Sequence, residues 1–153
     1  MQLTQFTDYS FRVLMFLAVK DDAATIGEIV ESYNVSRNHL TKVVHNLARM
    51  GYIKSARGKG GGIRLARKPE EINIGRLVLA TEPNFDLVEC FKAETAGCPL
   101  TPACMLRRVL GEAQRSFIET LDRYTLADLV RNRDTLAGLF TRRPVFQLPD
   151  RSS

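Results

Sequence analysis

Apolar residues recur at three- and four-residue steps through the N-terminal third of the chain, in three runs separated by polar or glycine-containing breaks. This spacing is typical of helices that bury one face, so the pattern predicts three helices. Thr7 is the expected cap of the first helix, and Asp21 marks its end. Thr25 begins the second helix. The third is predicted to begin at Ser36 and to end at Gly51.

A tight turn separates the second and third predicted helices. Asn34 lies in that turn, and asparagine tolerates the left-handed backbone conformation. Two short strand-like segments follow, 52–56 and 63–66, and a glycine-rich stretch joins them. Glycine permits positive φ and lets the backbone come close to a phosphate. The arrangement predicts a winged helix-turn-helix, in which the third helix enters the major groove of DNA.

The hydrophobic pattern after Cys104 is that of one long amphipathic helix. Apolar residues recur over 105–124 at helical spacing, so one face must be buried. Because the domain is small, pairing with a second copy is the expected solution, and packing against the chain's own core is the alternative. A short helix over 73–80 and short closing helices near the C-terminus complete the pattern. The expected fold class is therefore mainly α with a small β-wing.

This pattern divides the chain into four parts. They are a winged helix-turn-helix domain at 1–82, a cysteine-containing loop at 83–104, a dimerisation helix with closing helices at 105–141, and a disordered tail at 142–153. At 153 residues the chain is one domain, or a small domain with an appendage. No apolar run reaches the roughly eighteen residues of a membrane span, and the N-terminal apolar stretch lacks a signal-peptide cleavage site. A cytoplasmic protein that does not bind membranes is expected.

The charge distribution suggests a partner for this fold. Lysine and arginine outnumber the acidic residues by 22 to 17, which gives a formal net charge of +5. The basic residues concentrate between positions 37 and 68, the stretch that contains the third helix and the wing. A local excess of positive charge favours an anionic partner, and double-stranded DNA fits the predicted fold.

Three cysteines occur in the chain, all in one short stretch: Cys90, Cys98 and Cys104. A glycine and two prolines between them break regular structure, so the loop 83–104 can bring the sulfurs to one centre. Three thiolates and one outside ligand suit an iron–sulfur cluster or a zinc ion. The odd number argues against a disulfide framework. Zinc is disfavoured because no fourth cysteine or nearby histidine completes a tetrahedron, and a redox thiol switch stays open.

Four features together resemble the NsrR/IscR family of bacterial winged-helix regulators. They are the opening M-Q-L-T-Q-F-T-D-Y-S-F-R, the third-helix segment S-R-N-H-L-T-K-V-V-H-N-L, the wing R-G-K-G-G-G-I-R-L-A, and the three cysteines. The resemblance covers roughly residues 1 to 125. It implies a homodimer that binds palindromic promoter DNA, with an iron–sulfur cluster whose state controls the binding.

The resemblance also bears on the kind of cluster. IscR-type members place a histidine three residues after the third cysteine as a ligand to a 2Fe–2S cluster, and this chain has Arg107 there. The F-T-D-Y segment and the C-x7-C-x5-C spacing resemble the NsrR branch, which responds to nitric oxide. This implies a 4Fe–4S cluster on the three cysteines, with Asp8 of the partner subunit as a candidate fourth ligand. Glu89 and Glu94 are alternative ligands, and Asp8 has a second interpretation as a first-turn residue favoured by the helix dipole.

The predicted DNA contacts come from the third helix and the wing. At the helix N-terminus Arg37 suits guanine and Asn38 suits adenine, and a phosphate contact is the alternative role of Arg37. The candidates are Ser36, Arg37, Asn38, His39 and Lys42 in the helix, and Arg57, Lys59 and Arg64 in the wing.

The predicted function is a transcriptional repressor that releases operator DNA when nitric oxide destroys or nitrosylates its cluster. A cluster-assembly regulator, or a general redox or thiol-based regulator of the same family, is the alternative. An architectural DNA binder would show little sequence preference. An enzyme is not expected, because the chain has no G-K-[ST] nucleotide loop and no Ser/His/Asp arrangement, and both of its histidines fall on the predicted DNA face.

Overall fold

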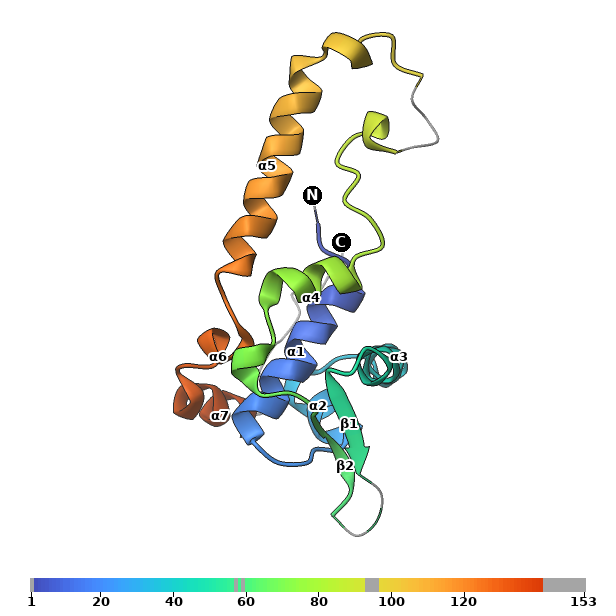
Figure 1. The fold of residues 1–153 in the computed structure, drawn as a ribbon. Helices are drawn as coiled ribbons and strands as arrows, with labels where there is room; N and C mark the ends of the chain where they lie inside the picture. The colour runs from blue at the N-terminus through green and yellow to red at the C-terminus, as the bar shows by residue number, and fades with distance from the viewer. Residues whose placement is uncertain (1, 57, 59, 93–96, 142–153) are drawn as a thin grey trace, which may run out of the picture.

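The computed structural model describes residues 2–56, 58, 60–92 and 97–141 of the chain. Its α-helices are α1 (Gln5–Lys20), α2 (Ile26–Tyr33), α3 (Arg37–Arg49), α4 (Ile74–Thr81), α5 (Met105–Asp122), α6 (Leu126–Leu129) and α7 (Arg133–Thr141). The strands β1 (Ile53–Ala56) and β2 (Gly62–Leu65) form one antiparallel sheet. The 3-10 helices are η1 (Pro69–Glu71), η2 (Glu89–Phe91) and η3 (Thr101–Ala103). The predicted fold class, mainly helical with a small β-wing, is confirmed (Figure 1).

Helix α1 begins earlier than its predicted cap. Thr4 is the N-cap, and its hydroxyl accepts a hydrogen bond from the Thr7 N–H at 3.3 Å. Thr7 lies inside the helix and is buried, and its hydroxyl donates to Thr81 Oγ1 at 2.9 Å. The prediction that Thr7 caps the helix is therefore wrong. Two threonines one turn apart offer the same capping group, and only the burial of Thr7 against α4 separates their roles.

Caps and left-handed residues set the breaks between the first three helices. Thr25 and Glu28 form a capping box at the start of α2. Asn34 ends α2 in the left-handed conformation with a φ of 51°, as its place in the turn predicts. Ser36 is the N-cap residue of α3, although its side chain makes no capping hydrogen bond, and Gly51 beyond the helix has a φ of 74°. The predicted helix-turn-helix is thus present.

The wing is attached to the helices at its base. Lys54 of β1 is paired with Arg64 of β2. Ala24, in the loop after α1, exchanges two backbone hydrogen bonds of 2.8 Å with Ile63. Gly62 lies beside this bridge with a φ of 155°, and a Cβ at this position would come within 2.6 Å of the Ala24 carbonyl oxygen. Position 62 therefore requires glycine for the wing to approach the α1–α2 loop this closely.

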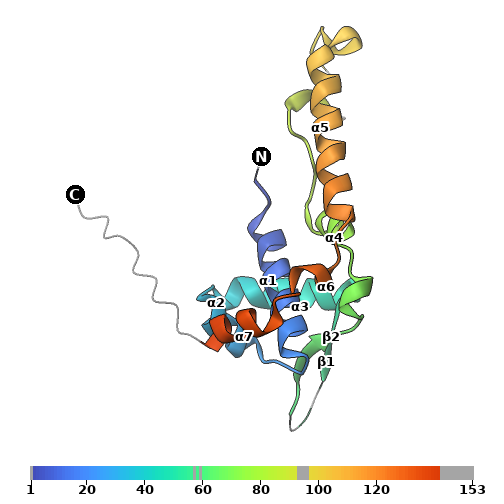
Figure 2. The ribbon, with the colours of Figure 1, turned by 90° about the vertical axis from the view of Figure 1, so that its left-hand side faces the viewer.

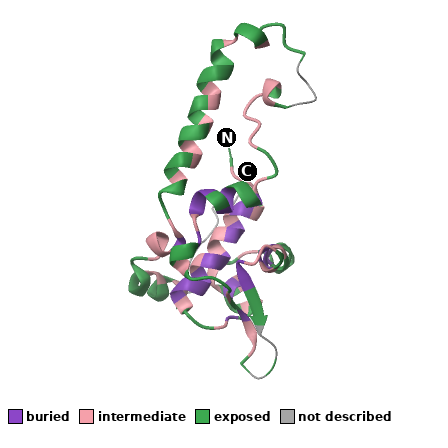
Figure 3. Ribbon diagram, in the orientation of Figure 1, coloured by how far each residue is buried: buried purple, intermediate pink, exposed green. Residues whose placement is uncertain are grey.

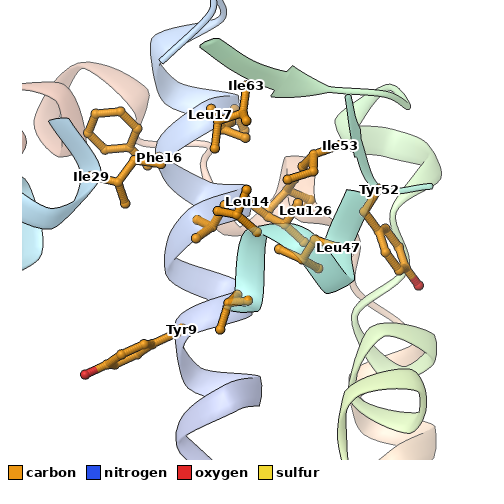
Figure 4. Close-up of a cluster of buried hydrophobic side chains, with 14 of the residues drawn as sticks. Tyr9, Leu14, Phe16, Leu17, Ile29, Leu47, Tyr52, Ile53, Ile63 and Leu126 are labelled. Carbon is orange, nitrogen blue, oxygen red and sulfur yellow. The ribbon is translucent and has the colours of Figure 1, made fainter. Parts of the chain in front are cut away.

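A single hydrophobic core lies inside the head, which we define as α1–α4, the wing, α6 and α7 (Figures 3 and 4). Its large, fully buried side chains are Leu14, Leu17, Ile29, Leu40, Leu47, Ile72, Leu77 and Leu126. Leu126 comes from α6, so the chain returns to the head after α5. Two backbone hydrogen bonds fix this return, from the Leu126 N–H to the Ile72 carbonyl at 2.8 Å and from the Ile74 N–H to the Tyr124 carbonyl at 3.0 Å.

Helix α5 projects from the head as a long arm (Figures 1 and 2). The structure describes all of its residues, and none of them is buried. Phe117 and Leu121 are partly covered, whereas Met105, Leu106 and Val109 near the outer end are 64%, 63% and 52% exposed. The predicted apolar face therefore remains largely uncovered within one chain. Within the described ranges, every helix is too short or too polar to cross a membrane.

Candidate nucleic-acid interface and cysteine segment

Helix α3 buries one side and exposes the other. The buried residues are Leu40, Val43, Val44 and Leu47. The five predicted contact residues of this helix are all exposed: Ser36, Arg37, Asn38, His39 and Lys42. Their exposure follows from the helical period, because they occupy the N-terminus and the steps between the core positions. The polar end of α3 is therefore free to approach a groove of DNA.

The wing presents two cations on one face. Arg64 and Lys54 are both exposed and lie directly opposite each other across the strand pair. Like charges in this position destabilise a sheet unless a counter-charge is near, and a phosphate supplies one. Sequence reasoning missed Lys54 as a candidate contact, although the antiparallel register of the wing strands would have placed it beside Arg64. The other two wing candidates, Arg57 and Lys59, fall outside the described residues.

The three cysteines lie on the segment that joins α4 to α5. Cys90 is in η2 and half-buried, Cys98 is exposed, and Cys104 is the half-buried N-cap residue of α5. All three are free thiols. Among the described residues, no group of three or more His, Cys, Asp or Glu side chains is close enough to hold a metal ion. Glu89 is described within η2, whereas Glu94 falls outside the described ranges.

The chemistry of these donors fits an iron–sulfur cluster. Cys104 Sγ accepts a hydrogen bond from the Arg107 N–H at 3.4 Å, at the positive end of α5. Cysteine sulfur is the donor that holds the iron atoms of such clusters in proteins. The Arg107 guanidinium lies 5.9 Å from the centre of the Phe91 ring. Since arginine has no lone pair to offer a metal, the residue at the IscR histidine position does not complete the ligand set.

Asp8 lies in the first turn of α1, where it is paired within its own subunit. Its Oδ2 is 2.9 Å from Arg12 Nη2, and its Oδ1 accepts a hydrogen bond from Arg12 Nε at 3.2 Å. The same guanidinium lies over the Tyr9 and Tyr33 rings, at 5.7 and 5.6 Å from their centres. Burial raises the pKa of Tyr33, so its phenol stays neutral and offers the cation an aromatic face.

Glu82 joins the start of α1 to the beginning of the cysteine segment. Its Oε1 accepts hydrogen bonds from the Thr4 N–H at 2.8 Å and from the Thr4 hydroxyl at 3.0 Å. Glu82 directly follows α4, and Pro83 opens the cysteine segment. Sequence reasoning missed this contact because the partners are 78 positions apart and belong to no motif. The contact holds the helix that carries Asp8 against the root of the segment that carries the thiols.

Comparison with known proteins places this geometry in a family. The model of the Rrf2 family, described as an iron-dependent transcriptional regulator, matches residues 3–132. The HTH-type transcriptional regulator NsrR of Halalkalibacterium halodurans is 49% identical over 146 residues, which cover 94% of this chain and 100% of that protein. The protein of the same name from Bacillus subtilis is 48% identical over 141 residues, 91% of this chain and 97% of that protein.

A solved structure shares the fold. IscR of T. potens superposes with a TM-score of 0.69 at 24% sequence identity, over 86% of this chain and 88% of that chain. The matches confirm the resemblance predicted from the opening segment, the third helix, the wing and the cysteines. They also confirm the prediction of a regulator rather than an enzyme. The chain belongs to the Rrf2 family of iron-dependent transcriptional regulators.

Proposed function

We propose that this protein is a dimeric, cytoplasmic transcriptional repressor that releases palindromic operator DNA in response to nitric oxide, through an iron–sulfur cluster that nitric oxide destroys or nitrosylates. The observation that carries the DNA-binding part is the exposed N-terminal end of α3 beside a wing with paired cations. The relatives named NsrR and the iron dependence in the family description support the sensing part.

The exposed residues of α3 suit the reading of base edges. The guanidinium of Arg37 matches the two acceptors of guanine, and the amide of Asn38 matches the donor and acceptor of adenine. Ser36, His39 and Lys42 hold the helix in register through the DNA backbone. On the wing, Lys54 and Arg64 bind phosphates. Arg57 and Lys59 remain proposed contacts on the basis of the sequence.

The uncovered end of α5 supports a homodimer. Met105, Leu106 and Val109 expose apolar side chains on a helix that extends away from the head. A second copy of the same helix offers the same apolar surface in return, as a two-fold interface requires. Two heads related by such an axis match a palindromic operator with two half-sites.

The proposed cluster is held by Cys90, Cys98 and Cys104, with a 4Fe–4S form favoured over 2Fe–2S. When bound, such a cluster supplies iron atoms that react with nitric oxide. The proposed fourth ligand is Asp8 of the partner subunit, and its carboxylate would exchange the Arg12 guanidinium for iron. Cys104 contributes a sulfur ligand at the N-terminus of α5, and Glu82 holds the root of the segment in place.

Replacing Arg64 with glutamine tests the proposed wing contact. The variant should reduce the slope of log affinity against log salt concentration by about one, because one phosphate contact is lost. The measurement is fluorescence anisotropy at several salt concentrations, on a duplex that the wild-type protein selects from a random-sequence pool. Arg76→Gln is the matched control, since Arg76 is an exposed arginine on α4. Equal slopes for Arg64→Gln and the wild type would rule out the wing contact at this residue.

A further inference from the structure

Arg67 makes a set of contacts that its position in the sequence does not reveal. It follows β2 by two residues, in the basic stretch between positions 37 and 68, where each cation is a candidate phosphate contact. Its side chain turns back to the end of α3. Nε donates to the Gly51 carbonyl at 3.0 Å, and Nη2 donates to the Met50 carbonyl at 3.2 Å. The guanidinium carbon lies 4.8 Å from the centre of the Tyr52 ring.

These contacts use properties that arginine alone combines. The C-terminal end of a helix carries partial negative charge and carbonyls without helical partners, so it attracts a cation. Met50 is the C-cap residue of α3, and Gly51 turns the chain in the left-handed conformation. A planar guanidinium can donate to two successive carbonyls while stacking on an aromatic ring. A lysine ammonium keeps the charge but cannot make both the paired carbonyl hydrogen bonds and the stacking contact with the ring.

The contacts connect the two elements that the proposed function uses on DNA. The Ala66 N–H donates to the Tyr52 carbonyl at 2.9 Å, so the two chain segments already run together at the base of the wing. Arg67 adds two hydrogen bonds across a separation of 16 and 17 positions, from the exit of β2 to the end of α3. These contacts lie at the junction between the end of α3 and the base of the wing.

We infer that Arg67 is a positioning residue that holds α3 and the wing in the relative orientation needed for both to contact DNA together, and that it is not a phosphate contact. The inference rests on the proposed DNA-binding function. Arg67 and Arg64 both lie in the basic stretch, and a count of charges cannot distinguish their roles.

The test compares Arg67→Lys with Arg67→Gln on the selected duplex and on a scrambled duplex of the same length. Both variants should bind the selected duplex about tenfold more weakly, because neither side chain can make the two carbonyl hydrogen bonds and the ring contact together. The wing keeps its phosphate contacts in the bound state, so the salt slope should stay at the wild-type value. The ratio of selected to scrambled affinity should fall, because the selected duplex depends more on the orientation of α3. A role limited to stability would lower the active fraction for both duplexes equally and leave that ratio unchanged. Thermal unfolding of each variant establishes that it is folded at the assay temperature.

Several outcomes would overturn the inference. Wild-type affinity in Arg67→Lys, together with a salt slope reduced by about one in Arg67→Gln, would make Arg67 a phosphate contact. An unchanged ratio of selected to scrambled affinity in both variants would make its role purely structural. If the wild-type protein selects no duplex, the proposed function fails and the inference fails with it. If the wild type selects a duplex and both variants bind it as tightly as the wild type does, the inference alone fails.

Discussion

Serine in place of Cys104 is expected to abolish the retention of iron and acid-labile sulfide, and to weaken operator binding by ~10³-fold or more, toward the level of non-specific DNA binding. The substitution separates ligation from folding. Cys104 is the N-cap residue of α5 and accepts a hydrogen bond from the Arg107 N–H. Serine is a good N-cap residue, so the helix keeps its cap while the thiolate is lost.

The measurement on Cys104→Ser is iron and sulfide content after purification without oxygen, followed by operator titration. Ala103→Ser is the matched control, because it adds the same hydroxyl at the neighbouring exposed position in η3. This control should retain wild-type iron content and affinity. Full iron content in Cys104→Ser would remove Cys104 from the ligand set.

A lysine at position 109 is expected to convert the dimer into a monomer and to lower operator affinity by ~10²–10⁴-fold, because a monomer loses the gain from binding two half-sites at once. Val109 is 52% exposed within one chain and lies beside the exposed Met105 and Leu106. If a second copy covers this surface, the added charge is buried without a partner. Within a single chain the same lysine stays in water and costs little stability.

Sedimentation velocity gives the oligomeric state of Val109→Lys, and anisotropy gives its affinity for DNA. Thr141→Lys at the exposed end of α7 is the control, since it adds the same charge to the head. It should remain dimeric with wild-type affinity. A dimeric Val109→Lys with unchanged affinity would place the interface elsewhere.

Local pattern predicted the elements well because their signals are local. The repeat over 105–124 corresponds to α5, and the steps between core positions placed the exposed residues of α3 correctly. The capping residue of α1 was wrong because Thr4 and Thr7 carry the same local signal, and burial against α4 is a tertiary fact. The docking of Leu126 into the head was not predicted for the same reason, since its partners lie far away in the sequence.

The candidate site was only partly predictable for related reasons. Exposed polar residues on a helix follow from periodicity, whereas Lys54 required the register of the wing, and Arg67 and Glu82 required contacts across 16 to 78 positions. The assembly of the cysteines around one centre stays a prediction. Thiol donors on an irregular segment take their final geometry from the metal that they bind, because metal binding and local folding are coupled.

The most direct test of the central claim is a nitric oxide titration of protein purified without oxygen, with iron, sulfide, visible absorption and operator binding followed in parallel. The protein is expected to be coloured and to contain iron and sulfide, and its absorption should bleach in step with the release of DNA. A colourless protein without iron that binds operator DNA equally well with and without nitric oxide would contradict that claim.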